Sequence, residues 1–226
     1  MTSPNSSFLL LCALAPEALA ARIGLQQVGA PGGRVALVGM GPSRARKAAA
    51  RLASVLPDGL PVVVLGVGGA LTGGFAAGDL VVANALGTAD ADGGELVVTR
   101  RPVPLDARSS AFSDQVAAAL SARFPSTRQA PTLSAGRTAK GPARSVLAES
   151  GAVVCDTESY WLSRLSERRP FAVVRSVVDS PDRELLSLQT FTGGVVGLKR
   201  LADVARVLTS LLARDVKVPP RQASIV

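Results

Sequence analysis

Short apolar runs alternate with helical patterns along most of this chain. Apolar runs with the length of buried strands cover residues 8–14, 34–38, 61–65, 80–85 and 132–135. Ala-rich or amphipathic stretches with helical spacing cover residues 16–23, 44–56, 109–124 and about 194–213. Strands that alternate with helices predict a layered α/β fold, and we expect a single domain over residues 8–213.

The stretch 152–180 departs from this pattern because its apolar runs end in carboxylates. One run is followed by Glu158 and the next by Asp179, with a segment of roughly helical spacing between them. If the two strands are parallel neighbours, both carboxylates lie just beyond the carboxyl ends of the strands. Open α/β sheets bind their ligands there, so this stretch is the candidate site.

Two glycine-rich segments follow predicted strands. Residues 39–41 precede Ser43, Arg44 and a predicted helix, and a turn of this kind offers backbone N–H groups to an anion or serves close packing alone. Residues 66–69 contain three glycines, which suit positive φ angles or a backbone pressed against a ligand or a neighbouring strand. Neither segment completes a dinucleotide or P-loop pattern.

The amino-acid composition restricts the core residues, the class of partner and the acid–base groups that this protein can use. Aromatic residues make up only 4% of the 226 residues, so the core must consist mainly of Val, Leu and Ala. The net charge of +8 is dispersed and few aromatic residues are present to stack on bases, so we expect no nucleic-acid partner. Cys12 and Cys155 fall in apolar runs without metal-ligand or redox spacing. Since the chain has no His, acid–base chemistry must depend on carboxylates.

The first apolar run has the features of a buried strand rather than a signal peptide. No Lys or Arg precedes Arg22, and Pro16 and Glu17 interrupt the apolar segment. We therefore expect a cytoplasmic protein without a stable membrane anchor, with flexible segments at 1–7 and 214–226. Glu17 lies at a strand-to-helix junction, where a carboxylate also favours the positive end of the helix.

The order of the sequence landmarks adds a family resemblance. CALAPE, GMG, LGVGGAL, GDLVVANAL, SAG, CDTES and VRSVVDS together resemble the purine nucleoside phosphorylase and nucleosidase superfamily, especially its methylthioadenosine nucleosidase-like branch. The match spans about residues 8–212. The segments GMGPSRAR and TESYWL look most like hopanoid-associated phosphorylases. The resemblance implies a three-layer fold, with a central mixed sheet flanked by helices, and a homo-oligomer.

The resemblance also implies a role for each candidate residue. Glu158 matches the glutamate that binds the ribose hydroxyls, Asp179 the aspartate that protonates N7 of the departing purine, and Glu17 the carboxylate that orients or deprotonates water. Asp179 would then be protonated in the substrate complex. The other implied substrate-binding residues are Gly66, Val67, Gly68, Gly69, Gly136, Thr157 and Arg175.

Two departures from the family pattern bear on the substrate. Thr138 or Ala139 stands where the nucleosidase branch has an aromatic residue that stacks on the base, and Thr157 stands where it has a methionine. A base held mainly by backbone groups, with a large apolar 5′ substituent, is compatible with both departures.

The nucleophile stays open between phosphate and water. Val64 and Val67 occupy the positions at which hexameric phosphorylases hold phosphate, whereas Gly41, Ser43 and Arg44 offer another anion site. Following the branch, we expect phosphorolysis of a lipid-linked adenine nucleoside such as adenosylhopane, with inorganic phosphate as co-substrate and no other cofactor. The alternatives are hydrolysis of a methylthioadenosine-like or futalosine-like nucleoside, and non-catalytic nucleoside binding.

Overall fold

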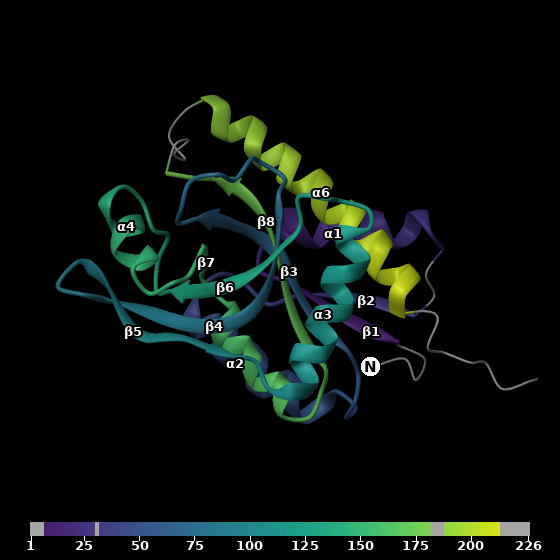
Figure 1. The fold of residues 1–226 in the computed structure, drawn as a ribbon. Coiled ribbons are helices and arrows are strands. Elements are labelled where there is room, and N and C mark those ends of the chain that lie inside the picture. Colours follow the sequence, from purple (N-terminus) through teal and green to yellow (C-terminus); the bar gives the residue numbers. More distant parts are fainter. Residues whose placement is uncertain (1–6, 30–31, 182–187, 213–226) are drawn as a thin grey trace, which may run out of the picture.

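The structure is a computed structural model that describes residues 7–29, 32–181 and 188–212 (Figure 1). Strands and helices alternate along most of it, as the apolar pattern predicts. The elements are β1 (Phe8–Cys12), α1 (Ala15–Gln27), β2 (Gly33–Leu37), α2 (Pro42–Val55), β3 (Val62–Ala70), β4 (Leu80–Asp92), β5 (Glu95–Pro104), α3 (Ala107–Ser121), β6 (Arg128–Ala135), α4 (Pro142–Ala148), β7 (Val154–Asp156), α5 (Ser159–Leu162), the 3-10 helix η1 (Ser163–Glu167), β8 (Phe171–Asp179) and α6 (Leu188–Leu212).

The eight strands form one mixed sheet that closes on itself. Its order is β2-β1-β3-β7-β6-β4-β5, and β8 pairs with both β3 and β4. Strands β3, β7, β6, β4 and β8 therefore form a ring of paired strands in the centre of the molecule (Figure 1). Both parallel pairs, such as β3 with β8, and antiparallel pairs, such as β4 with β8, occur in this ring.

The two carboxylate-bearing strands, β7 and β8, are not the parallel neighbours that the placement of the candidate site assumed. β3 lies between them, parallel to β8 and antiparallel to β7. This arrangement is possible because β3 is longer than its neighbour β1. β1 pairs with β3 only over Val62 to Val64, and β7 then pairs with Gly69 and Ala70. Both carboxylate-bearing strands thus end beside the last residues of β3.

Helices cover both faces of the sheet, which confirms the predicted layered fold. One hydrophobic cluster joins alternate residues of β1 and β3, such as Leu10 and Val63, to helices α1, α3 and α6. The other joins their neighbours, such as Leu9 and Val62, to α2, α5 and η1. Because both faces are buried, these strands are apolar at successive positions rather than alternating.

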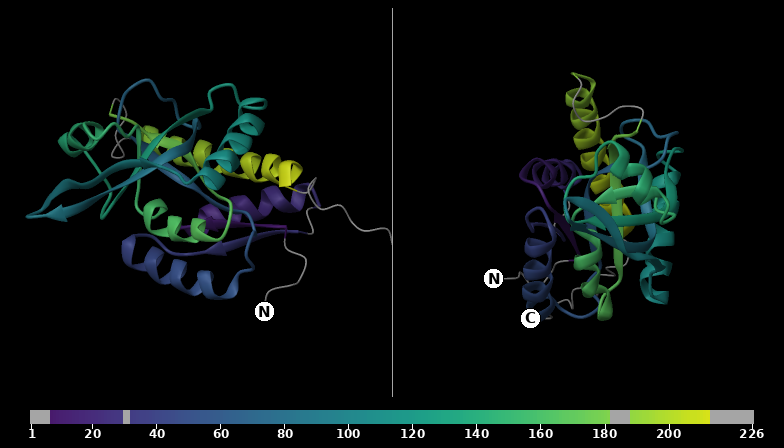
Figure 2. Two further views of the ribbon diagram at one scale, coloured as in Figure 1. Left: turned by 60° about the horizontal axis from the view of Figure 1, so that its bottom comes forward. Right: turned by 90° about the vertical axis from the view of Figure 1, so that its left-hand side faces the viewer.

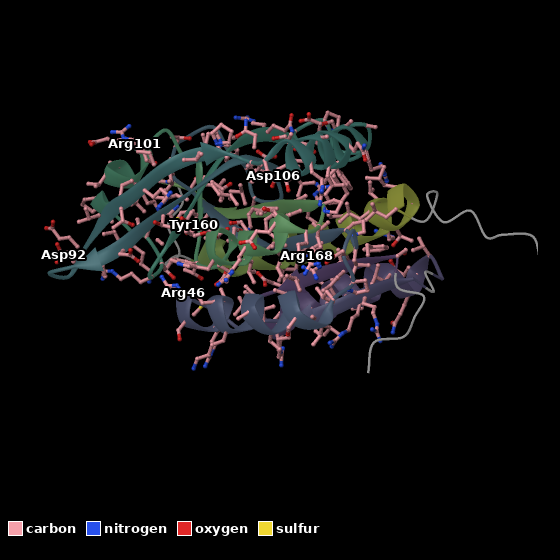
Figure 3. All side chains as sticks on the ribbon, turned by 90° about the horizontal axis from the view of Figure 1, so that it is seen from below. Arg46, Asp92, Arg101, Asp106, Tyr160 and Arg168 are labelled. Atoms are coloured by element: carbon pink, nitrogen blue, oxygen red, sulfur yellow. The ribbon has the colours of Figure 1, made fainter. Side chains whose placement is uncertain are left out.

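Strands β3, β4 and β6 are longer than their apolar runs predict. β4 continues past the apolar run 80–85 as far as Asp92 and pairs with β5. Gly93 and Gly94 join the strands with φ angles of +54° and +89°, and such positive angles suit a two-residue hairpin turn. The hairpin projects from the body of the molecule, with Asp92 near its tip (Figures 2 and 3).

Most residues at the two ends of the chain lie outside the ranges that the structure describes. Of the predicted flexible segments 1–7 and 214–226, only Ser7 is described, and its N–H donates to the carbonyl of Gly32 over 2.8 Å. Within the described ranges, no helix has both the length and the apolar character needed to cross a membrane.

Candidate active site

A pocket of about 240 Å³ lies at the carboxyl ends of β3 and β8. Three carboxylates predicted from the sequence line it together: Glu17 from the first turn of α1, Glu158 from the start of α5, and Asp179 from the end of β8. Each residue is at most 4% exposed. The fold thus assembles in one cavity three acidic groups that lie far apart in the sequence.

Glu17 is fixed by backbone N–H groups from two elements. Its Oε2 accepts hydrogen bonds from the N–H groups of Ala13 and Leu14, at 3.0 and 2.9 Å, and its Oε1 accepts one from Val67 of β3 at 2.8 Å. The carboxylate therefore stabilises the N-terminus of its own helix and also lines the pocket. The helix-stabilising interpretation of Glu17 is thus confirmed, whereas its role toward a water molecule stays a prediction.

Glu158 is held from the opposite direction. The N–H of Gly41 donates to its Oε1 over 2.9 Å, the hydroxyl of Thr157 donates to the same oxygen, and Arg175 Nη2 lies 3.6 Å from its Oε2. Burial raises the pKa of Glu158 above its usual value, and the opposing effect of Arg175 is smaller. The glycine turn predicted to bind an anion therefore directs an N–H group to a protein carboxylate.

Asp156 and Arg175 form a buried ion pair behind Glu158. The Asp156 carboxylate accepts hydrogen bonds from Arg175 Nε at 2.9 Å, the Ser134 hydroxyl at 2.5 Å and the N–H groups of Glu158 and Ser159 at 3.0 and 3.1 Å. Burial alone would raise the pKa of Asp156, but Arg175 and these hydrogen bonds hold it below its usual value. Sequence reasoning missed Asp156 as a site residue, although it belongs to the CDTES landmark.

Asp179 forms a second buried ion pair, with Arg144 of α4. Arg144 Nη2 donates to Asp179 Oδ2, and its Nη1 donates to the carbonyl of Ala70 over 2.5 Å. Arg144 also lines the pocket and is only 2% exposed. The sequence did not assign Arg144 to the site, because no local pattern indicates a partner 35 residues away.

The predicted glycine-rich turn at 66–69 is the second half of β3, and none of its glycines has a positive φ angle. These glycines allow close approach instead. A Cβ atom at Gly66 would lie 2.3 Å from Arg175 Nη1 and 2.8 Å from Glu17 Oε1, and one at Gly69 would lie 2.7 Å from Asp179 Oδ1. The charged side chains pack directly against the strand backbone.

The pocket lining contains some of the other predicted residues and not others. Val67, Gly68, Gly69, Thr138, Ala139 and Thr157 line it, whereas Gly41, Ser43, Arg44, Gly66, Gly136 and Arg175 do not. Ser43 and Arg44 belong to α2, and the N–H of Gly136 donates to the carbonyl of Ala89 over 2.9 Å.

The pocket offers neither a reactive thiol nor a metal site in the described part of the chain. Cys155 lines the cavity, but burial raises the pKa of its thiol to about 12, so the thiol stays protonated at neutral pH. No group of three or more Cys, Asp or Glu residues within the described ranges is arranged to hold a metal ion. The ionisable side chains that line the pocket, apart from this thiol, are those of Glu17, Arg144, Asp156, Glu158 and Asp179.

Comparison with known proteins identifies the fold. No family model and no curated protein matches the sequence. Among solved structures, the 5′-methylthioadenosine/S-adenosylhomocysteine nucleosidase of Helicobacter pylori is similar over 94% of this chain and 100% of its own, with a TM-score of 0.71 and 16% identity. The futalosine hydrolase of the same organism is similar over 93% and 98%, with a TM-score of 0.70 and 16% identity.

The S-adenosylhomocysteine nucleosidase of Streptococcus pyogenes, in complex with 5-methylthiotubericidin, is similar over 93% of this chain and 99% of its own. Its TM-score is 0.69 at 16% identity. The chain therefore has the nucleoside phosphorylase/nucleosidase fold over nearly its whole length, as the sequence resemblance implies.

Proposed function

We propose that the protein is a nucleosidase that hydrolyses the N-glycosidic bond of a purine nucleoside with an apolar 5′ substituent. The observation that supports this most strongly is that Glu17, Glu158 and Asp179 line one buried pocket. The similar structures bear the names of nucleosidases and a hydrolase, which agrees with a hydrolytic reaction.

The reaction requires charge stabilisation on both sides of the breaking bond. Cleavage develops positive charge on the ribose and negative charge on the base, and groups that stabilise these charges favour the transition state over the ground state. Glu158 binds the ribose hydroxyls, and Asp179 lies at the base. Glu17 accepts the proton of the attacking water, and such base catalysis is typically worth about 10²–10⁴-fold in rate.

The charges of the site favour water over phosphate as the nucleophile. Ser43 and Arg44, the side chains predicted to hold phosphate, do not line the pocket, and the N–H of Gly41 donates to Glu158. Arg144, which does line it, is paired with Asp179. A phosphate dianion would therefore enter a cavity lined by carboxylates, which repel it. The predicted phosphorolysis of a lipid-linked nucleoside such as adenosylhopane has no comparable support.

Apolar side chains support the proposed 5′ substituent. Leu14, Met40, Leu71 and Val178 line the same cavity as the carboxylates. Leu14 and Met40 are 38% and 52% exposed, so a ligand that covers them would remove apolar surface from water. A methylthio or larger alkyl group at the 5′ carbon would gain this contact, whereas a free 5′ hydroxyl would not.

The test is base release from 5′-methylthioadenosine and adenosine, with and without inorganic phosphate, followed by separation of ribose sugars from ribose 1-phosphates. We expect release that is independent of phosphate, faster for the methylthio compound, and about 10²–10⁴-fold slower in Glu17→Gln. Asp58→Asn is the matched control, since the Asp58 side chain is 53% exposed and does not line the pocket.

The other outcomes identify the alternatives. Formation of a ribose 1-phosphate product would show phosphorolysis and reject water as the nucleophile. Nucleoside binding without base release from either compound would favour a non-catalytic binding protein. Unfolding by urea, followed for Glu17→Gln, separates lost chemistry from lost structure, because glutamine cannot accept hydrogen bonds from all three backbone N–H groups that Glu17 binds.

A further inference from the structure

Among the described residues, hydrogen bonds hold the Glu158 carboxylate at one of its two oxygens. Its Oε1 accepts from the Thr157 hydroxyl and, over 2.9 Å, from the N–H of Gly41. Arg175 Nη2 lies 3.6 Å from Oε2, beyond the usual range of a hydrogen bond. The same nitrogen donates to the hydroxyl of Ser159 over 2.8 Å instead. Both hydrogen bonds that the described chain makes to this carboxylate therefore end on Oε1.

The second oxygen of Glu158 keeps its capacity to accept hydrogen bonds. A carboxylate has about four lone-pair sites, two on each oxygen, so two donors fill Oε1 and leave the sites of Oε2. Glu158 is 3% exposed and lines the pocket, and buried acceptors normally have a partner. A ribose hydroxyl is a donor that can fill this role. The arrangement thus assigns Oε1 to the protein and Oε2 to a ligand.

The Thr157 hydroxyl is the part of this arrangement that a substitution can remove. The donor at Gly41 is a backbone N–H, which every residue except proline retains. The backbone of Glu158 is held independently, because its N–H donates to Asp156 over 3.0 Å. Loss of the hydroxyl should therefore free the carboxylate to rotate without releasing the segment that carries it.

We infer that Thr157 is a positioning residue of this site, whose hydroxyl fixes Oε1 of Glu158 so that Oε2 accepts a hydrogen bond from a hydroxyl group of the ribose. The inference rests on the proposed function and adds to it a side chain that acts through Glu158. The family resemblance places a methionine at position 157, and methionine has no hydrogen to donate. This chain therefore holds its glutamate by a hydrogen bond that a methionine cannot form.

The same hydrogen bond affects the ionisation of Glu158. Burial raises the pKa of Glu158, and the charge of Arg175 opposes this rise. Asp156 raises the pKa and the Thr157 hydroxyl lowers it, each by a smaller amount. The other charged side chains that line the pocket are those of Glu17, Arg144 and Asp179. Valine at position 157 changes none of these charges, so the pKa of Glu158 should rise through the loss of the hydroxyl alone.

The experiment measures base release from 5′-methylthioadenosine by Thr157→Val and Thr157→Ser as a function of pH. Valine keeps the branched shape of threonine without its hydroxyl, whereas serine keeps the hydroxyl. In Thr157→Val we expect kcat/KM at neutral pH to fall by about 10-fold, mainly through KM, since the ribose is already bound in the substrate complex. The acidic limb of its kcat/KM profile should also move to higher pH. Thr157→Ser should keep the wild-type limb and most of the wild-type kcat/KM.

Thr127→Val is the matched control for the loss of a threonine hydroxyl. The half-buried Thr127 donates to the carbonyl of Phe124 over 2.7 Å and does not line the pocket. Its kinetics and its pH profile should match those of the wild type.

Three results would overturn the positioning role of Thr157. These are wild-type kinetics in Thr157→Val, a loss of kcat/KM that is equal at every pH, and a loss that serine does not restore. The first shows that the hydroxyl does not matter, and the other two show a contribution that does not pass through Glu158. If wild-type protein releases no base, with or without phosphate, the proposed function itself fails and the role of Thr157 fails with it.

Discussion

Alanine at position 66 should damage the site through a single added carbon atom. That Cβ would lie 2.3 Å from Arg175 Nη1 and 2.8 Å from Glu17 Oε1. Arg175 is 1% exposed and held by Asp156 and Ser159 at 2.9 and 2.8 Å. Glu17 is held by three backbone N–H groups. Neither side chain can move without breaking these hydrogen bonds.

The expected losses of stability and of rate in Gly66→Ala follow from the close packing. Overpacking a well-packed interior typically costs about 1–3 kcal/mol, less than the roughly 5–15 kcal/mol that stabilises a typical domain. The protein should therefore fold, with a Tm about 2–12 °C lower, since each 1 kcal/mol shifts Tm by about 2–4 °C in a domain of this size. A displacement of about 1 Å at Glu17 is enough to cost about 10²-fold in rate.

Gly136→Ala is the matched control for Gly66→Ala. A Cβ atom at Gly136 would meet nothing closer than 3.6 Å, and this glycine does not have a positive φ angle. Its stability and its rate of base release should match the wild type. Both variants are measured by thermal unfolding and by base release from the best nucleoside substrate. If Gly66→Ala matched Gly136→Ala in both assays, the close packing against β3 would not matter.

Two further predictions concern the acidic residues beside Arg175. Asp156→Asn should destabilise the protein by about 3 kcal/mol at neutral pH, because it leaves Arg175 buried without this charged partner. The pKa of Asp156 is held below its usual value, so its contribution is present above that value and is lost as the pH falls through the native pKa. Urea unfolding from pH 7 to pH 3 should therefore show the wild type approaching the variant, and a constant difference would contradict this. Burial raises the pKa of Glu158, so stability is lost as the pH rises from its unfolded to its native pKa. Glu158→Gln should become more stable relative to the wild type over that rise while it loses nucleoside affinity in a binding titration, and parallel stability curves would count against the raised pKa.

The order of the elements was predictable because their apolar patterns are local. β1 and the first half of β8 are apolar at successive positions, since both of their faces are covered by other elements. The ends of β3 and β4 were not predictable in the same way. β3 continues through Gly66, Gly68 and Gly69 because β7 and β8 pair with it there, and these partners lie far along the chain. Glycine has a low intrinsic preference for strands, so only tertiary pairing explains this extension.

The residues of the candidate site differ in the same way: local patterns indicate some of them, and only the fold shows the others. Glu158 and Asp179 were recognisable because each is a carboxylate that follows an apolar run. Arg144 did not, since it is one of 25 basic residues and its partner is 35 positions away. Asp156 was passed over although it precedes Glu158 by only two positions, because its function is to hold neighbours through hydrogen bonds that are visible only in the fold.

The second half of β3 contains mostly small residues because its backbone lies directly against the charged groups of the site. The backbone of residues 66–70 meets the charged groups of the site in order: Gly66 packs against Arg175, Val67 donates to Glu17, Gly69 packs against Asp179, and Ala70 accepts from Arg144. Side chains from α1, α4 and β8 are thereby positioned by the backbone of one strand, β3, which is paired on both edges. Larger side chains here would separate these charges from one another, so the glycines set the spacing of the carboxylates more directly than any residue that carries a charge.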